Sequence, residues 1–329
     1  MTPRPLSLAR QTLRALRLLL GVACLLLLAA PARSELPTLS LAVLQFGTAH
    51  WELDHLKRQG LDQANGFRLE VRLVADVPAS RLAVTSGSAQ GTVSDLLWAQ
   101  ARHEAGASFV FMPFSSQIGE VVVPEGSDIR ELSALAGKRL GVAGGPEGQA
   151  WLLLARVARE QGLDLARQAT VQFAAPPLLG QSLRRGQVDA LLTFWHFAAR
   201  MRGEGGVRTA FTLDELLAGA GLTPDLPVLG YLFPEPWARD HGELLVRFQR
   251  ALAETKRQLA ENPEAWDALR PLMGAEDEAV FEALRAGFVA GIPGPLTEDG
   301  VEALRELLVL TGTEPERLMP ASLFHPAAP

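Results

Sequence analysis

The sequence predicts an α/β fold of two lobes that face each other across a cleft, followed by a helical C-terminal region. In the stretch around Gly186 a helix ends, a glycine supplies a left-handed turn, and the apolar strand 188–193 follows and opens at Phe194. The same order of helix end, glycine and short strand occurs far earlier, in 85–94. Two strand ends built alike and so distant in the chain indicate two separate sheets.

The first lobe is predicted from alternating strands and helices. Apolar runs indicate strands, and Gly60 and Gly106 each end an amphipathic helix. In chain order we expect strand 39–44, helix 50–59, strand 67–74, a helix that ends at 86, strand 90–93, helix 96–105 and strand 108–112.

The alternation breaks at 113–116, where the next strand follows without a helix between them. Passage from strand to strand suggests that the chain crosses into the other lobe, and a later strand returns it. We predict strand 120–123, helix 129–135, strand 139–143, helix 149–161, strand 170–173, helix 178–185, a flexible turn at 203–206, return strand 228–233, helices over 236–262, 281–288 and 301–310, and a loose tail at 320–329. The lobes are therefore expected at 33–112 with 231–329, and at 113–230.

The first 32 residues have the pattern of a signal peptide. Four arginines lead into the apolar run 18–29, and Ala30-Pro31-Ala32 has the form of a signal-peptidase site. The run is shorter than the about 20 residues that span a bilayer, which disfavours a membrane anchor. We expect a periplasmic protein whose net charge, −6 for the whole chain, becomes −10 after cleavage. Cys24, the single cysteine, lies in the signal core, and lipidation there is the lesser alternative.

Composition and motifs exclude several functions. The chain is acidic and has no cluster of basic and aromatic residues, which disfavours nucleic acid as a partner. No nucleophile elbow, phosphate-binding loop, zinc signature or dinucleotide fingerprint occurs, so we expect no enzyme, no cofactor and no metal. His50 and His55 are five residues apart and do not share a helix face. We expect a monomer.

Four segments together resemble one family. They are 61–74, 86–93, the Leu-x-x-Leu-x-Gly-Lys-Arg-Leu-Gly-Val stretch 132–142 and the Gly-Gln-Val-Asp-Ala stretch 186–190. The chain resembles periplasmic solute-binding proteins of ABC importers, in the group that binds nitrate, sulfonates, taurine and thiamine precursors. The resemblance implies the two-lobed type II periplasmic-binding-protein fold, with a mixed sheet flanked by helices in each lobe. It also implies a ligand between the lobes, and delivery of that ligand to an ABC permease with a cytoplasmic ATPase.

The resemblance also implies which residues line the cleft. They are Gly47, Thr48 and His50 after the first strand, Ser94 after the third, Gly144, Gly145 and Glu147 before a second-lobe helix, and Phe194, Trp195 and His196. Trp51 joins them because aromatic faces near the cleft loops can hold an organic cation, with Glu147 as the counter-charge. Trp151 is expected in the core, and His50 with His196 could meet across the cleft.

Two departures from the family pattern change the expected ligand. Pro146 removes an amide donor where the family holds an oxyanion, and Glu147 would repel an anion there. His196 and Phe197 replace an Asp-Pro pair. An organic cation or a neutral solute is therefore favoured over a sulfonate or nitrate.

Two other functions stay open. One is a periplasmic ligand-binding module that serves a sensor or a dehydrogenase. The other is a fold-sharing thiamine-precursor enzyme, although that relative carries a cysteine-rich iron motif that this chain lacks. A hinge is expected near 112–113 and 229–231, and Ser115-Ser116 suits a hinge better than a nucleophile.

Overall fold

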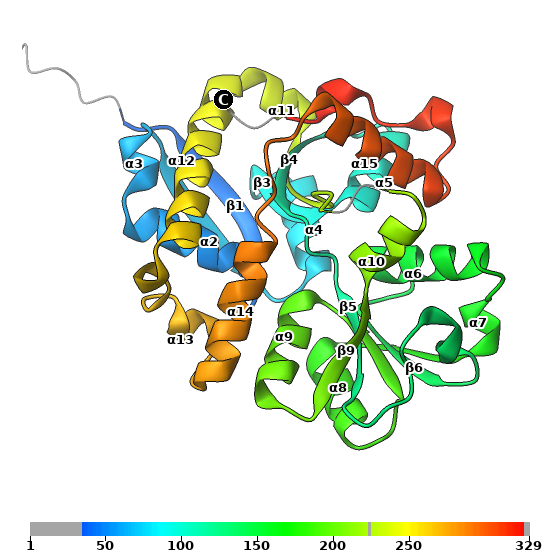
Figure 1. Cartoon of the computed structure of the whole chain (residues 1–329). Helices are drawn as coiled ribbons and strands as arrows, with labels where there is room; N and C mark the ends of the chain where they lie inside the picture. Colours follow the sequence, from blue (N-terminus) through cyan, green and yellow to red (C-terminus); the bar gives the residue numbers. More distant parts are fainter. Residues whose placement is uncertain (1–34, 223–224, 326–329) are drawn as a thin grey trace, which may run out of the picture. The chain divides into compact units, whose positions relative to one another are not determined.

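Two five-stranded mixed sheets form the framework (Figure 1). The first is ordered β2 (Arg68–Val74), β1 (Thr38–Leu44), β3 (Gly91–Asp95), β10 (Leu229–Pro234) and β4 (Phe109–Ser115). The second is ordered β7 (Thr170–Ala174), β6 (Arg139–Ala143), β8 (Ala190–Thr193), β5 (Glu120–Pro124) and β9 (Val207–Thr212). The computed structural model describes residues 35–222 and 225–325, and both sheets belong to the unit that begins at Pro37. The predicted signal peptide, 1–32, lies outside the described residues.

The parallel strands are β1 to β3 in the first sheet and β6 to β8 in the second, and β10 and β5 run antiparallel to their neighbours. The chain leaves the first sheet after Ser115, enters the second at Glu120, leaves it after Thr212 and returns at Leu229. The first passage is the strand-to-strand step that the sequence predicts, and β10 matches the predicted return strand, but the second passage includes the helix α10.

Helices flank both sheets. With the first sheet come α2 (Thr48–Arg58), α3 (Leu61–Ala64), α4 (Val77–Thr85) and α5 (Leu96–Glu104), and with the second come η1 (Leu132–Leu135), α6 (Gln149–Glu160), α7 (Leu165–Gln168), α8 (Pro176–Arg184), α9 (Trp195–Glu204) and α10 (Leu213–Gly219). The C-terminal region holds α11 (Glu235–Asp240), α12 (Gly242–Glu261), η2 (Pro263–Trp266), α13 (Arg270–Met273), α14 (Glu278–Ala290), α15 (Glu298–Leu310), η3 (Pro315–Arg317) and η4 (Ala321–Leu323). None of the helices in the described ranges is long and apolar enough to cross a membrane.

Several predicted elements differ from the structure. The expected helix 129–135 is only the single turn η1, and the expected helix 236–262 breaks at His241 into α11 and α12. Neither β9 nor α10 was predicted from the sequence. The reason is that β9 is an edge strand with mostly half-buried side chains, so its apolar pattern is weak.

The predicted loose tail is wrong as far as residue 325. Met319, Leu323 and Phe324 are buried. The side chain of Gln100 on α5 holds this segment, because its Nε2 donates to the Arg317 carbonyl (2.8 Å) and its Oε1 accepts from the Met319 amide (2.8 Å). The tail therefore packs on the first sheet, and residues 326–329 lie outside the described part.

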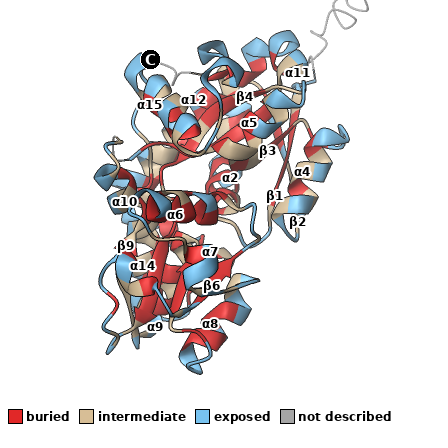
Figure 2. Ribbon diagram, turned by 90° about the vertical axis from the view of Figure 1, so that its right-hand side faces the viewer, coloured by how far each residue is buried: buried red, intermediate tan, exposed pale blue. Residues whose placement is uncertain are grey.

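Apolar side chains join the cores of the two sheets. Figure 2 shows the buried segments of both sheets in red. One buried cluster joins Phe111 of β4 to Val121 of β5 and to Leu304 of α15. A second cluster places Trp195 and Ala199 of α9, a helix of the second sheet, within the core of the first. The burial of apolar side chains thus crosses the boundary between the sheets.

Helix α9 packs tightly on α14, and two glycines allow it. A Cβ on Gly203 would lie 2.7 Å from the Val280 Cα, and one on Gly287 would lie 2.5 Å from the Trp195 ring. Arg200 of α9 donates to the Gly274 carbonyl (2.9 Å) and to the Met273 carbonyl at the end of α13. The two helices therefore approach more closely than any side chain at these positions would permit.

This packing predicts that Gly203→Ala destabilises the protein by about 1–3 kcal/mol, because the Val280 backbone cannot move away from an added methyl. Gly219 at the end of α10 has open space around it, so Gly219→Ala should stabilise by up to about 1 kcal/mol through helix propensity alone. Urea unfolding of both variants measures the contrast. Equal effects would contradict the close packing of α9 on α14.

Candidate functional site

All the residues predicted to line the cleft lie at the carboxyl ends of parallel strands or in the first turn of the following helix. Gly47 to Trp51 begin α2 after β1, Ser94 is near the end of β3, Gly144 to Glu147 join β6 to α6, and Phe194 to His196 begin α9 after β8. Ligands of open α/β sheets bind at this edge. The candidate site is therefore built from strand exits of both sheets.

Three helices begin at these exits without a capping side chain. The N-cap residues of α2, α6 and α9 are Gly47, Gly148 and Phe194, and none of these helices has an acidic residue in its first turn. In contrast, Asp76 and Asp95 cap α4 and α5. An uncapped helix start presents amide donors and the positive end of the helix dipole. The site thus offers hydrogen-bond donors at three helix ends.

Two tryptophans join the exits of the two sheets. The rings of Trp51 and Trp195 meet edge to face, with centroids 6.4 Å apart and an interplanar angle of 86°. Phe288 of α14 lies 6.3 Å from Trp51. Only 2% of Trp51 and 5% of Trp195 is exposed, so other side chains cover both rings in this structure. Phe288 was not predicted, because nothing in its local sequence marks it.

The loop between β6 and α6 touches the start of α9. Gly144 has φ +89°, its amide donates to the Ala174 carbonyl (3.1 Å), and a Cβ there would lie 3.8 Å from the Phe194 ring. The Gly145 carbonyl accepts from the Gly148 amide (3.0 Å). Glu147 is exposed, whereas the two tryptophans are buried. Glu147, the predicted counter-charge for a cation, is therefore in contact with solvent and does not share the buried environment of Trp51 and Trp195.

Ser94 belongs to a polar cluster that was not predicted from the sequence. The Arg81 Nε donates to the Ser94 hydroxyl (3.0 Å), and Arg81 forms an ion pair with Asp95 (2.5 Å). Asp95 also accepts from the Trp98 amide (2.9 Å), so Asp95 alone caps α5. Because Ser94 accepts from arginine, its own hydroxyl hydrogen is available to an acceptor.

The two predicted histidines, in the first turns of α2 and α9, each contact residues close to them in the chain. The Nδ1 of His50 lies 2.9 Å from the Gln45 carbonyl. His196 stacks on Phe194 with centroids 6.2 Å apart, and its ring lies 4.5 Å from that of Phe197. Burial, and secondly the nearby Arg200 cation, lower the pKa of His196 to about 4. His196 is therefore uncharged at neutral pH.

Buried polar atoms without a partner mark further residues at the strand exits. They are the side-chain amide of Gln149 at the first position of α6, the hydroxyl of Thr193 at the end of β8, and Nε1 of Trp51. Gln149 is 7% exposed and Thr193 1%. Such groups cost free energy unless something binds them. A glutamine at the start of a helix after a glycine-rich loop could have been found from the sequence.

Trp151 lies in the core, which was the favoured expectation for it. It is 8% exposed, and its ring meets that of Phe173 at 5.6 Å. Within 35–222 and 225–325, no three histidine, cysteine or acidic side chains gather closely enough to hold a metal ion.

Comparison with known proteins identifies the family. The family model described as "NMT1/THI5 like" matches residues 59–266, which is more than half of the chain. The chain belongs to the NMT1/THI5-like family. A search of curated proteins with the sequence of this NMT1/THI5-like protein finds no match.

Solved structures show the fold of this NMT1/THI5-like protein. The alkanesulfonate-binding protein SsuA from Xanthomonas axonopodis pv. citri, bound to MOPS, is 21% identical with a TM-score of 0.68, and the match covers 89% of this chain and 99% of SsuA. SsuA from Escherichia coli is 17% identical with a TM-score of 0.67, over 83% and 91% of the two chains. The nitrate-binding protein NrtA from Synechocystis PCC 6803 is 13% identical with a TM-score of 0.56, over 76% and 69%. The fold is that of type II periplasmic binding proteins.

The lowered pKa of His196 predicts a pH dependence of stability. The unfolded chain takes up this proton near pH 6.5, and the folded protein only near pH 4, so stability falls as the pH drops between these values. In His196→Asn this contribution is absent. From pH 7 to pH 5 the free energy of unfolding of the variant should therefore fall by up to about 2 kcal/mol less than that of the parent. Denaturant unfolding at both pH values tests this. The same loss in both proteins would contradict the lowered pKa.

Proposed function

We propose that this NMT1/THI5-like protein is a periplasmic solute-binding protein that holds a small organic molecule between the strand exits of its two sheets and delivers it to an ABC permease with a cytoplasmic ATPase. The observation that carries the proposal is the meeting of uncapped helix starts with the Trp51–Trp195 contact, which joins the exits of both sheets. The names of the similar structures, alkanesulfonate-binding and nitrate-binding, support the same role.

The polar groups of the site support a neutral or zwitterionic ligand. Uncapped helix starts and the Ser94 hydroxyl donate to acceptor oxygens, and the Gln149 amide can both donate and accept. His196 is uncharged at neutral pH and brings no cation for a free anion. Glu147 adds negative charge beside the start of α6, which disfavours a simple sulfonate or nitrate. The aromatic rings supply the apolar walls.

Access to the site requires the lobes to separate. Residues 33–112 with 231–329 would form one lobe and 113–230 the other, with a monomer as the working unit. Trp51 and Trp195 are almost fully buried against each other, so a solute reaches the strand exits only when this contact opens. The passages between the sheets, after Ser115 and after Thr212, are the natural hinges.

The ligand class can be tested directly. Native mass spectrometry of the protein purified from its own periplasm shows any retained solute, and calorimetric titration then compares choline, glycine betaine and ethanesulfonate as cation, zwitterion and anion. We expect glycine betaine, the zwitterion, to bind more tightly than choline or ethanesulfonate. Tightest binding of choline or of ethanesulfonate would overturn the ligand class, and conversion of any retained compound by the protein alone would overturn the binding role.

Trp51→Phe should weaken binding of the tightest of these probes about 10- to 100-fold, because the variant lacks the indole N–H and part of the aromatic wall. Trp151→Phe is the matched control, since Trp151 lies in the core and should leave affinity unchanged. Calorimetry on both variants, with circular dichroism to check folding, decides the matter. Equal affinities would remove Trp51 from the site.

A further inference from the structure

One ammonium group ties the candidate site to the first passage between the sheets. Lys256 extends from α12, and its Nζ donates to the Glu52 carboxylate (2.9 Å) and to the Phe114 carbonyl (2.9 Å). The same Nζ lies 4.9 Å from the centre of the Phe114 ring and 5.8 Å from that of Phe288. Charge-assisted hydrogen bonds of this kind are strong and directional.

The partners of Lys256 belong to segments that matter for opening. Glu52 follows Trp51 directly in α2, the helix that begins at the exit of β1. Phe114 is the residue before Ser115, the last residue of β4, after which the chain leaves the first sheet. Phe288 of α14 also contacts Trp51. A shift of the end of β4 must therefore break the bonds of Lys256 or move Lys256 with it.

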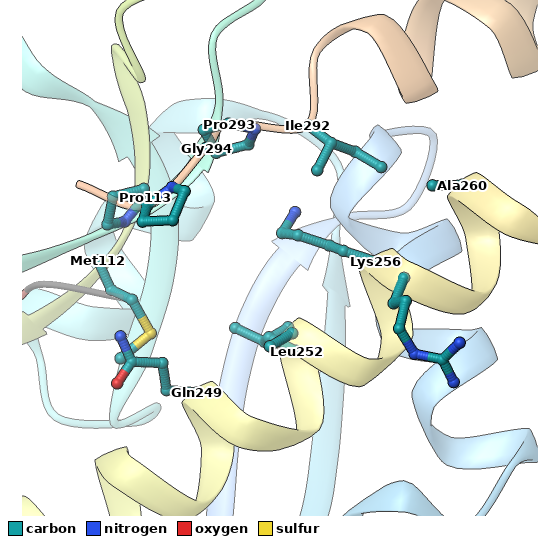
Figure 3. Close-up of a pocket in the computed structure, with 12 residues that line it drawn as sticks. Met112, Pro113, Gln249, Leu252, Lys256, Ala260, Ile292, Pro293 and Gly294 are labelled. Atoms are coloured by element: carbon teal, nitrogen blue, oxygen red, sulfur yellow. The ribbon is translucent and has the colours of Figure 1, made fainter. Parts of the chain in front are cut away.

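Apolar packing leaves space on one side of this group. A cavity of about 310 Å³ borders Lys256. Figure 3 shows Met112 and Pro113 on one side of it and Ile292 to Gly294 on another. Close packing would fix neighbouring segments without polar contacts. Beside this cavity, the hydrogen bonds of Lys256 have to fix α2 and the end of β4 in place.

Stability alone does not explain a buried ion pair here. Glu52 is fully buried and the Lys256 side chain is 12% exposed. Removing two such charges from water costs about as much as their attraction returns, so an apolar pair of similar volume is often as stable. What an apolar pair cannot supply is a bond of fixed direction to the Phe114 carbonyl.

We propose that Lys256 is a positioning residue that fixes α2 and the end of β4 relative to each other. Movement at the first passage between the sheets is thereby transmitted to Trp51. The use of this coupling in solute capture rests on the proposed function, but the coupling itself does not need a ligand. Its test is therefore made on the free protein.

The test replaces the ion pair by an apolar pair, Lys256→Met with Glu52→Leu, in the full chain. Hydrogen exchange followed by mass spectrometry reports on α2 and on 112–118, where the Ser116 amide bonds to the Gly291 carbonyl (3.1 Å). Spin labels at the exposed positions Gln63→Cys and Arg167→Cys, with Cys24→Ser to leave no other thiol, report on the distance between the two halves.

We expect an unchanged unfolding midpoint, exchange at least tenfold faster in both segments, and a broader distance distribution. The single variant Lys256→Arg keeps the charge and the donors, so it should exchange as slowly as the parent protein. The neighbouring exposed pair on α12 is the control, and Arg257→Met with Glu261→Leu should change none of these readouts. If the apolar pair does not fold, Glu52→Gln keeps an acceptor for Lys256 and should give a smaller increase in the same two segments.

Parental exchange and an unchanged distance distribution in the folded apolar-pair variant would overturn the proposal. Faster exchange in α2 alone, with 112–118 unchanged, would overturn it as well, because the two segments would then be uncoupled. Failure of every probe to bind the parent protein would contradict the proposed function. It would not affect the exchange rates and distance distributions, which are measured on the free protein. The two proposals can therefore fail separately.

Discussion

The edge-to-face contact between Trp51 and Trp195 is the constraint on which the arrangement of the site depends. It joins the helix after β1 to the helix after β8, and Gly287 leaves room for the second ring. An aromatic pair of this geometry contributes only about 0.5–1.5 kcal/mol beyond the apolar area that it buries. The contact is thus strong enough to align the strand exits and weak enough to break in the separation of the halves that the proposed function requires.

Helix starts differ in how their first amides are satisfied. The side chains of Asp277 and Thr297 cap α14 and α15, whereas α8 and α12, which carry none of the predicted site residues, also begin without a side-chain cap. At α2, α6 and α9 these amides have no side-chain cap, and buried polar atoms of Trp51, Gln149 and Thr193 lack partners. Other buried polar atoms without a partner lie elsewhere, for example on Ser40 and Tyr231, but those of the strand exits are placed where a polar guest would satisfy them.

Sequence patterns predicted the strand exits well, because short apolar strands followed by glycine and a helix start are local signals. Gly144 and Phe194 accordingly lie together. The pattern could not reveal Phe288 or Lys256, since each meets α2 through contacts that span more than half of the chain. The expected cation site also failed to appear as one unit, because Glu147 is exposed and the tryptophans are buried. Long-range packing, rather than local propensity, decides these positions.

The C-terminal segment held by Gln100 also protects the first sheet from other molecules. Strand β4 is an outer strand of that sheet, and an unpaired outer strand can template association with a second chain. Phe324 forms a parallel bridge with Phe111, and the His325 amide donates to the Phe111 carbonyl (2.8 Å). The C-terminal segment therefore already pairs with part of the outer edge of β4. At the opposite margin, Arg68, Glu70 and Arg72 of β2 place charges along the strand. Both edges of the first sheet are thereby protected from pairing with another chain.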